Sequence, residues 1–185
     1  MLKTWIPEEI PEKEELKKRI KEAGEKLYQM KLKEHKLPVL VLFEGWGASG
    51  KGTTIGRVIK YIDPRFFKVA TMSKPTEDEL RRPFLYRYFN QIPEAGKFTF
   101  LDSGWMEQTC KDCLNGLEEE DYAKRIDSIK HFERQLTDNG YLVLKFFMQI
   151  DKKEQEKRFR QRQENPEKQW KITDEDWRNR EKWEQ

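Results

Sequence analysis

Cysteine, histidine and net charge are scarce in this chain of 185 residues. It has 2 Cys and 2 His, and 37 Lys and Arg against 34 Asp and Glu leave a formal net charge of +3. Two cysteines cannot form a disulfide framework, and Cys110 and Cys113 have no second pair to complete a zinc site, so we expect incidental thiols in a reducing compartment. The balanced charge excludes a histone-like polycation and gives no reason to expect a nucleic-acid partner.

Long apolar runs are also missing. No run approaches the roughly 20 residues that a membrane-spanning helix needs, and the first residues lack the apolar core of a secretion signal. We therefore expect a cytoplasmic protein that makes no membrane contact. The chain is instead rich in charge of both signs, at 38% of residues, and in aromatic side chains, at 12%. Because aromatic side chains supply the apolar area that offsets the entropy lost on folding, we expect a folded chain.

Strands and helices alternate along the sequence. The run Val39–Phe43 is apolar throughout, which is typical of a parallel strand covered on both faces. The residue patterns predict strands over 39–43, 67–72, 98–101 and 141–150 and helices over 12–35, 51–62, 76–90, 121–138, 151–164 and 173–183. This alternation indicates an α/β fold built around a mainly parallel sheet. We expect residues 1–36 to form an N-terminal helical extension and residues 37–185 to form the main domain.

A phosphate-binding loop follows the first predicted strand. Residues 45–51 read Gly-Trp-Gly-Ala-Ser-Gly-Lys and fit the pattern G-x-x-x-x-G-K between a strand and a helix. In such a loop, backbone N–H groups converge on phosphate oxygens, and the lysine adds a mobile cation. The residue after the lysine is Gly52, so the hydroxyl that usually holds magnesium is absent there. The expected phosphate-binding residues are Gly45, Gly47, Ala48, Ser49, Gly50, Lys51, Gly52 and Thr53.

An acid stands at the end of the third predicted strand. Asp102 directly follows the apolar run 98–101. In enzymes with a phosphate-binding loop, an acid at the end of a neighbouring strand holds magnesium, and parallel sheets bind ligands at that edge. The alternative is that Asp102 only caps the next segment. Together with the loop, Asp102 is our candidate ligand for Mg²⁺.

Several segments together resemble one family. They include 43–52, 63–65, 74–76, 87–89, 92–97, 102–105, 132–136, 158–162 and 170–183, in order from about Leu37 to the last residue. The chain resembles the polyphosphate kinase 2 family, and its closing stretch Trp170–Trp183 is most similar to the branch that phosphorylates AMP. The resemblance implies a P-loop kinase-like three-layer α/β/α sandwich with a helical lid. It also implies magnesium-dependent phosphoryl transfer between inorganic polyphosphate and a nucleotide, AMP or ADP, by a homo-oligomer.

The resemblance assigns roles to particular residues. Lys51, Asp102, Arg158 and Arg162 are the expected catalytic residues, and Arg87, Lys171 and Arg178 join the loop in binding phosphate and nucleotide. The basic residues after position 157 either form a wall for a long polyanion or are a solvated charged face. Because the family's last helix continues beyond Gln185, we expect the chain to be cut short at this end.

Two positions depart from the family pattern, so alternative functions stay open. Gly47 and Ser103 stand where the family usually has Asp and Arg, and residues 107–121 contain six acids against one base, Lys111. One alternative is a catalytically impaired domain that binds phosphate, regulates or dimerises within a two-domain polyphosphate kinase. Another is an ATP-dependent kinase of a small molecule.

Overall fold

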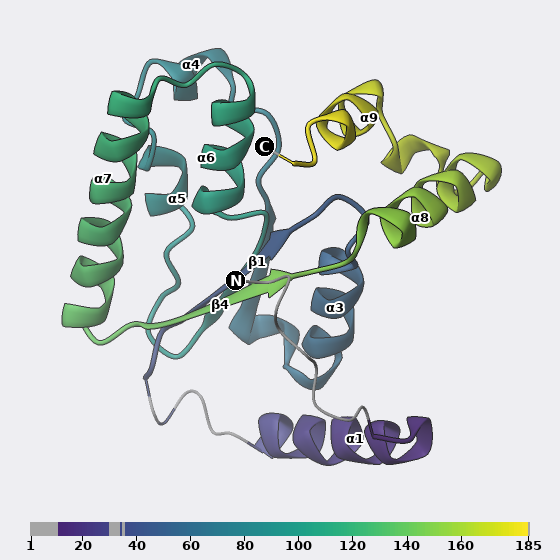
Figure 1. Cartoon of the computed structure of the whole chain (residues 1–185). Helices are drawn as coiled ribbons and strands as arrows, with labels where there is room; N and C mark the ends of the chain where they lie inside the picture. The colour runs from purple at the N-terminus through teal and green to yellow at the C-terminus, as the bar shows by residue number, and fades with distance from the viewer. Residues whose placement is uncertain (1–10, 30–33, 35, 185) are drawn as a thin grey trace.

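A parallel sheet forms the centre of the molecule. The computed structural model describes residues 11–29, 34 and 36–184, and the strands found there are β1 (Val39–Gly45), β2 (Phe67–Thr71), β3 (Phe98–Asp102) and β4 (Leu142–Met148). They pair in the order β2-β3-β1-β4 with every pair parallel (Figure 1). The prediction of an α/β sandwich around a parallel sheet is confirmed.

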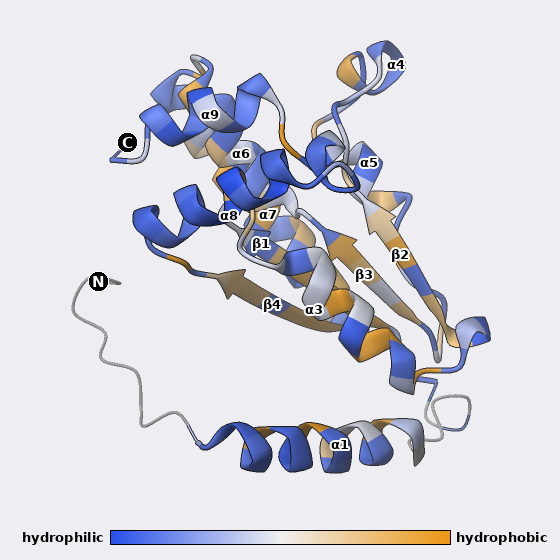
Figure 2. Cartoon of the chain, turned by 90° about the vertical axis from the view of Figure 1, so that its right-hand side faces the viewer, coloured by the Kyte–Doolittle hydropathy of each residue, from blue (hydrophilic) through white to orange (hydrophobic). Residues whose placement is uncertain are grey.

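Alternate residues of β1 face two different helical layers. Leu40 and Leu42 point to a core shared with α5 (Tyr86–Phe89), α6 (Trp105–Leu114) and α7 (Glu119–Asp138). Val39, Val41 and Phe43 point the other way, to a core shared with α3 (Lys51–Val58). This is the period of two that a strand imposes, and burial on both faces explains the continuous apolar run. Figure 2 shows the apolar residues gathered on the strands.

The predicted helix over 76–90 is wrong. The structure has two short helices there, α4 (Glu77–Leu80) and α5, with Pro83 between them. Proline lacks the N–H that continues a helix, and its ring clashes with the preceding turn. Thr76 still caps α4, in a capping box with Glu79. Helix α6 begins at Trp105, three residues after Asp102, and was not predicted from the sequence.

The C-terminal helices lie over the carboxyl edge of the sheet. They are α8 (Lys152–Glu164), the short turn η4 (Gln169–Lys171) and α9 (Asp174–Glu181), drawn in light green to yellow in Figure 1. Trp183 stacks on Trp46 of the loop after β1, with ring centroids 3.9 Å apart. The indole N–H of Trp46 donates to the Gln149 side chain at 2.7 Å. These contacts join the C-terminal segment to the loop after β1, and the lid that the resemblance implies over residues 107–121 remains a prediction.

The first helix packs at the opposite end of the molecule. Helix α1 (Lys13–Gln29) contacts the turn η2 (Ile59–Tyr61), where Gly24 lets the Tyr61 ring approach its backbone. Residues 1–10, 30–33 and 35 of the predicted extension lie outside the described residues, and its boundary at residue 36 remains a prediction. Within the described part of the chain, no helix is long and apolar enough to cross a membrane.

Candidate phosphate-binding and nucleotide-binding site

The loop after β1 enters the left-handed region of the backbone at three positions. Gly45, Ala48 and Gly50 have positive φ values of 122°, 61° and 106°. Ala48 has a Cβ, and residues with a Cβ seldom enter this left-handed region. Such a residue often marks a functional site. No side chain caps the first turn of α3, so its N–H groups remain available to an anion.

Side chains of helix α8 hold this loop by donating hydrogen bonds to the carbonyl groups of the loop. The Gln155 amide donates to Gly47 O at 3.1 Å. The Arg158 guanidinium donates from Nη1 to Ala48 O at 3.0 Å and to Ser49 O at 3.1 Å. These bonds turn the carbonyls toward α8. Arg158 was expected to contact the transferred phosphate, and the structure places one of its nitrogens on the loop itself. This role of Gln155 was not predicted from the sequence, because nothing in the sequence distinguishes it from the other glutamines of α8.

The loop lysine is paired with an acid from α6. Lys51 Nζ donates to Gly45 O at 2.7 Å and lies 3.1 Å from Glu107 Oε2. Their side chains are only 11% and 12% exposed. The other carboxylate oxygen of Glu107 accepts from the Ser103 hydroxyl at 3.0 Å and lies 3.0 Å from Lys111 Nζ. Sequence reasoning counted Glu107 among the acids of 107–121 and gave no signal of this contact.

Asp102 lies beside the start of α3. A Cβ on Gly52 would stand 3.2 Å from Asp102 Oδ2, so the carboxylate occupies space next to the position that lacks a hydroxyl. Burial raises the pKa of Asp102, Lys51 opposes the rise, and the charge of Glu107 adds to it. Among the described residues no three His, Cys, Asp or Glu side chains form a metal-binding group.

A buried acid on β1 fixes the start of α6. Glu44 Oε1 accepts from the backbone N–H of Met106 at 2.9 Å and, more weakly, of Glu107 at 3.4 Å. Burial raises the pKa of Glu44, and these two bonds oppose the rise. Ser103 takes a φ of 74° to make the turn between β3 and α6. These contacts set the direction in which Glu107 leaves the helix.

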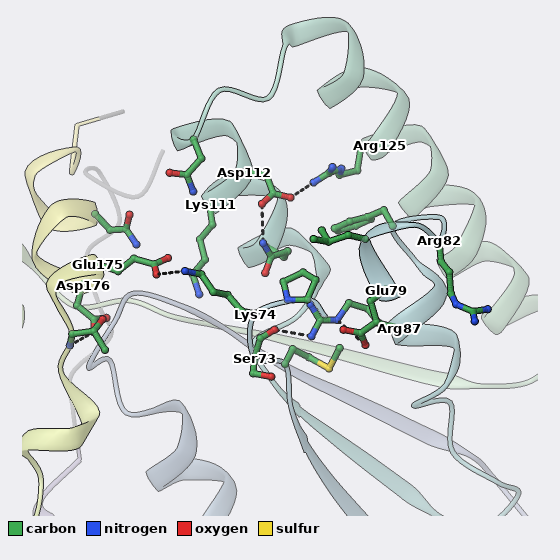
Figure 3. A pocket seen from close by; sticks show the side chains of 18 residues that line it. Ser73, Lys74, Glu79, Arg82, Arg87, Lys111, Asp112, Arg125, Glu175 and Asp176 are labelled. Carbon is green, nitrogen blue, oxygen red and sulfur yellow. Dashed lines mark hydrogen bonds and ion pairs between the residues drawn. The ribbon is translucent and has the colours of Figure 1, made fainter. Parts of the chain in front are cut away.

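The larger cavity opens beside the carboxyl ends of β2 and β3. It has a volume of about 570 Å³, and its lining comes from residues 72–75, α4, α6 and α9 (Figure 3). Arg87 donates from Nη2 to Ser73 O at 2.6 Å and lies 3.8 Å from Glu79. Its Nε and Nη1 are buried without a hydrogen-bond partner. Because buried donors without a hydrogen bond are costly, Arg87 is a candidate to bind a ligand in this cavity.

A smaller basic cavity lies against the phosphate-binding loop. Its volume is about 220 Å³, and it is lined by Ala48, Gly50, Thr53, Arg158, Gln161, Arg162 and Lys168. Burial and the neighbouring Arg158 lower the pKa of Arg162, and Asp176 opposes this. The structure thus brings Arg158 and Arg162 together at the loop. Lys171 and Arg178 are exposed and line neither cavity.

Comparisons with known proteins identify the family of the chain. The family described as Polyphosphate kinase 2 (PPK2) matches residues 10–185. A polyphosphate:AMP phosphotransferase of Pseudomonas syringae pv. tomato is 40% identical over 158 residues, which is 85% of this chain and 31% of the relative. The same activity names a relative from Acinetobacter johnsonii, 37% identical over 172 residues, which is 92% of this chain and 35% of the relative.

A solved structure shows the same fold. A Pseudomonas aeruginosa PA01 crystal structure described as polyphosphate kinase 2 superposes with a TM-score of 0.89 at 33% sequence identity, covering 99% of this chain and 40% of its own. The chain therefore spans about a third of the length of the curated relatives it matches. With the family pattern matched from residue 10 to residue 185, the chain belongs to the polyphosphate kinase 2 family.

Proposed function

We propose that this chain transfers a phosphoryl group between inorganic polyphosphate and a nucleotide. The observation that carries the proposal is the loop 45–51, which has a basic cavity against it and lies near a larger cavity containing an arginine with unpaired donors. Such a transfer needs little covalent chemistry from the protein, because positioning and charge neutralisation lower most of the barrier. The site offers these groups at one edge of the sheet.

The smaller cavity is the proposed place for polyphosphate. Arg158, Arg162 and Lys168 bring three cations to the loop. Burial is the main cause that lowers the pKa of Arg162; the charge of Asp176 opposes it, and the neighbouring Arg158 adds a smaller repulsion. An anionic chain relieves that repulsion and accepts charge-assisted hydrogen bonds. A phosphate in this cavity also reaches the backbone N–H groups at the start of α3.

The larger cavity is the proposed place for the nucleotide. Its volume of about 570 Å³ is in the usual range of small-molecule sites. Arg87 supplies unpaired donors for a phosphate, Lys111 adds charge on the side of the loop lysine, and Phe84 and Met72 add apolar surface. Since two relatives carry AMP in their names, AMP is the first acceptor to test and ADP the second.

Magnesium is the proposed metal, with Asp102 as its protein ligand. Mg²⁺ commonly binds one or two carboxylates and completes its shell with water and substrate phosphates. A single half-buried carboxylate beside the loop fits that requirement. The ion would neutralise charge on the transferred phosphate, while Lys51 and the loop orient it.

Turnover of the purified chain tests the proposal. Polyphosphate with AMP or ADP and magnesium should yield the next higher nucleotide, and Lys51→Met should reduce the rate by about a hundredfold or more. ATP serves as the alternative donor. If ATP alone works and polyphosphate is inert, the chain is an ATP-dependent kinase of a small acceptor.

A second candidate function is phosphate binding with weak or no turnover. The contact that favours it is the pairing of Lys51 with Glu107, which engages the loop lysine within the protein. In a longer protein, such a domain would regulate the rest or support dimerisation. Binding of polyphosphate without transfer to either nucleotide identifies this case. The expected homo-oligomer remains a prediction that sedimentation of the purified chain tests.

A further inference from the structure

We propose that Glu107 is an internal counter-ion of the loop lysine, and that phosphate binds at the loop only by displacing the Glu107 carboxylate from Lys51. This rests on the proposed function in one respect, because it takes the loop to be a phosphate site. Glu107 then sets the affinity of the site for phosphate by acting through Lys51. It is a positioning residue and not a catalytic one.

Two loop carbonyls and one carboxylate surround the ammonium group of Lys51. An ammonium has three donors. Lys51 Nζ approaches Gly45 O at 2.7 Å, Trp46 O at 3.4 Å and Glu107 Oε2 at 3.1 Å. The two carbonyls belong to the loop and stay with it when an anion binds. The carboxylate is the only partner of the three that is itself an anion, so it is the partner that phosphate replaces.

Glu107 is held in place on its far side. Its Oε1 accepts from Ser103 Oγ at 3.0 Å and pairs with Lys111 at 3.0 Å. Glu44 binds the N–H groups at the start of α6. These contacts hold the Glu107 carboxylate in an orientation that points toward Lys51. Glu107 is therefore not a flexible surface side chain.

The charge of Lys51 compensates the burial of Glu107 Oε2, the second oxygen of this carboxylate. Glu107 Oε2 is buried and has no hydrogen-bond partner in the described part of the chain, so the nearby charge of Lys51 compensates its burial. A phosphate that takes Lys51 leaves this oxygen uncompensated and adds a second anion next to it. Both effects oppose phosphate binding. A neutral isostere at position 107 removes both.

Calorimetric titration of the full chain with tripolyphosphate in metal-free buffer tests the inference. Glu107→Gln should bind tripolyphosphate about tenfold more tightly than the unaltered chain, since it removes a competing buried charge. Glu94→Gln is the control, because Glu94 is an acid paired with Lys97 at 2.8 Å, and Lys97 lies beside the start of β1, at the other end of the strand from the loop. Its affinity should be unchanged. A residue that only supports the fold would lower the affinity when altered, so a gain is specific to this role.

The outcomes separate this inference from the proposed function. If the unaltered chain binds tripolyphosphate and Glu107→Gln binds it equally or more weakly, the counter-ion role is overturned while the phosphate site stands. If neither protein binds it, both are overturned. If Glu107→Gln does not fold, the affinity of Glu107→Asp for tripolyphosphate is measured instead. Its shorter side chain places the carboxylate farther from Lys51. That variant should also bind more tightly, and unchanged affinity overturns the inference.

Discussion

The carboxylate of Asp102 stands directly against the backbone of Gly52. A Cβ at position 52 would lie 3.2 Å from Asp102 Oδ2, closer than nearly all real Cβ contacts. The residue after the loop lysine is thus small because the acid from β3 uses the space. The absence of a side chain at position 52 therefore goes together with the position of the Asp102 carboxylate.

Gly52→Ala should weaken magnesium binding without unfolding the protein, because it adds a Cβ and no hydroxyl. The new Cβ pushes the Asp102 carboxylate by a few tenths of an ångström, and we expect magnesium affinity in the presence of tripolyphosphate to fall about fivefold to tenfold, or about 1–1.4 kcal/mol. Gly56→Ala in the same helix is the control, since a Cβ there meets nothing within 4 Å. Calorimetry measures both. Equal affinities in the two variants would contradict the proposed role of Asp102.

Asp102→Asn should change how stability depends on pH. Burial raises the pKa of Asp102 above its unfolded value of 3.8, so the folded state holds the proton more tightly than the unfolded state. Stability contributed by the protonated form is therefore lost as pH rises through the interval between the two pKa values. The free energy of unfolding of Asp102→Asn, relative to the unaltered chain, should increase from pH 3 to pH 7. Urea unfolding at several pH values measures it.

Magnesium gives the matching control for that experiment. At pH 7 the ion should stabilise the unaltered chain against unfolding in the presence of tripolyphosphate and leave Asp102→Asn largely unaffected, because only the former keeps the carboxylate. Equal stabilisation of both proteins would show that the ion binds elsewhere.

The parts of the site that are continuous in sequence were predictable. Residues 45–51 and Asp102 follow apolar strands, and parallel strands bring such ends to one edge. Glu107 and Gln155 were not predictable, because their contacts with the loop depend on where α6 and α8 cross the sheet. In the sequence, Glu107 is one of six acids between residues 107 and 121, and only the tertiary structure shows that it contacts Lys51. Likewise, the break between α4 and α5 at Pro83 was readable and was overlooked.

Gly47→Asp should destabilise the protein in the absence of metal. A Cβ at position 47 would lie 3.4 Å from Phe159 Cζ and 3.5 Å from Asp176 Oδ1. The added carboxylate therefore stands beside an existing one, and we expect a loss of about 1–2 kcal/mol of unfolding free energy. Thermal unfolding in metal-free buffer measures it. Adding Asp176→Asn, which keeps an acceptor for the Thr173 cap, should recover most of the loss; no recovery would mean that crowding by Phe159 is the cause.

Arg87→Gln should reduce affinity for AMP more than Arg82→Gln does. Both arginines line the larger cavity, but Arg82 already pairs with Asp78 at 3.0 Å, whereas two nitrogens of Arg87 form no hydrogen bond in the described part of the chain. Loss of a charged donor to phosphate costs about tenfold or more in affinity. Calorimetric titration with AMP compares the two variants. Equal affinities would place the nucleotide outside this cavity.

Arg158→Met should lower affinity for tripolyphosphate by about tenfold and unfolding free energy by about 1–2 kcal/mol. The variant loses the bonds from Nη1 to the carbonyls of Ala48 and Ser49, so the loop no longer holds its binding conformation. Arg160→Met is the control, because Arg160 lies on the same helix, is exposed and pairs with Glu156. If both variants lose affinity equally, the effect comes from the general charge of α8. A loss confined to position 158 shows that Arg158 itself supports phosphate binding, through its bonds to the loop and its charge in the smaller cavity.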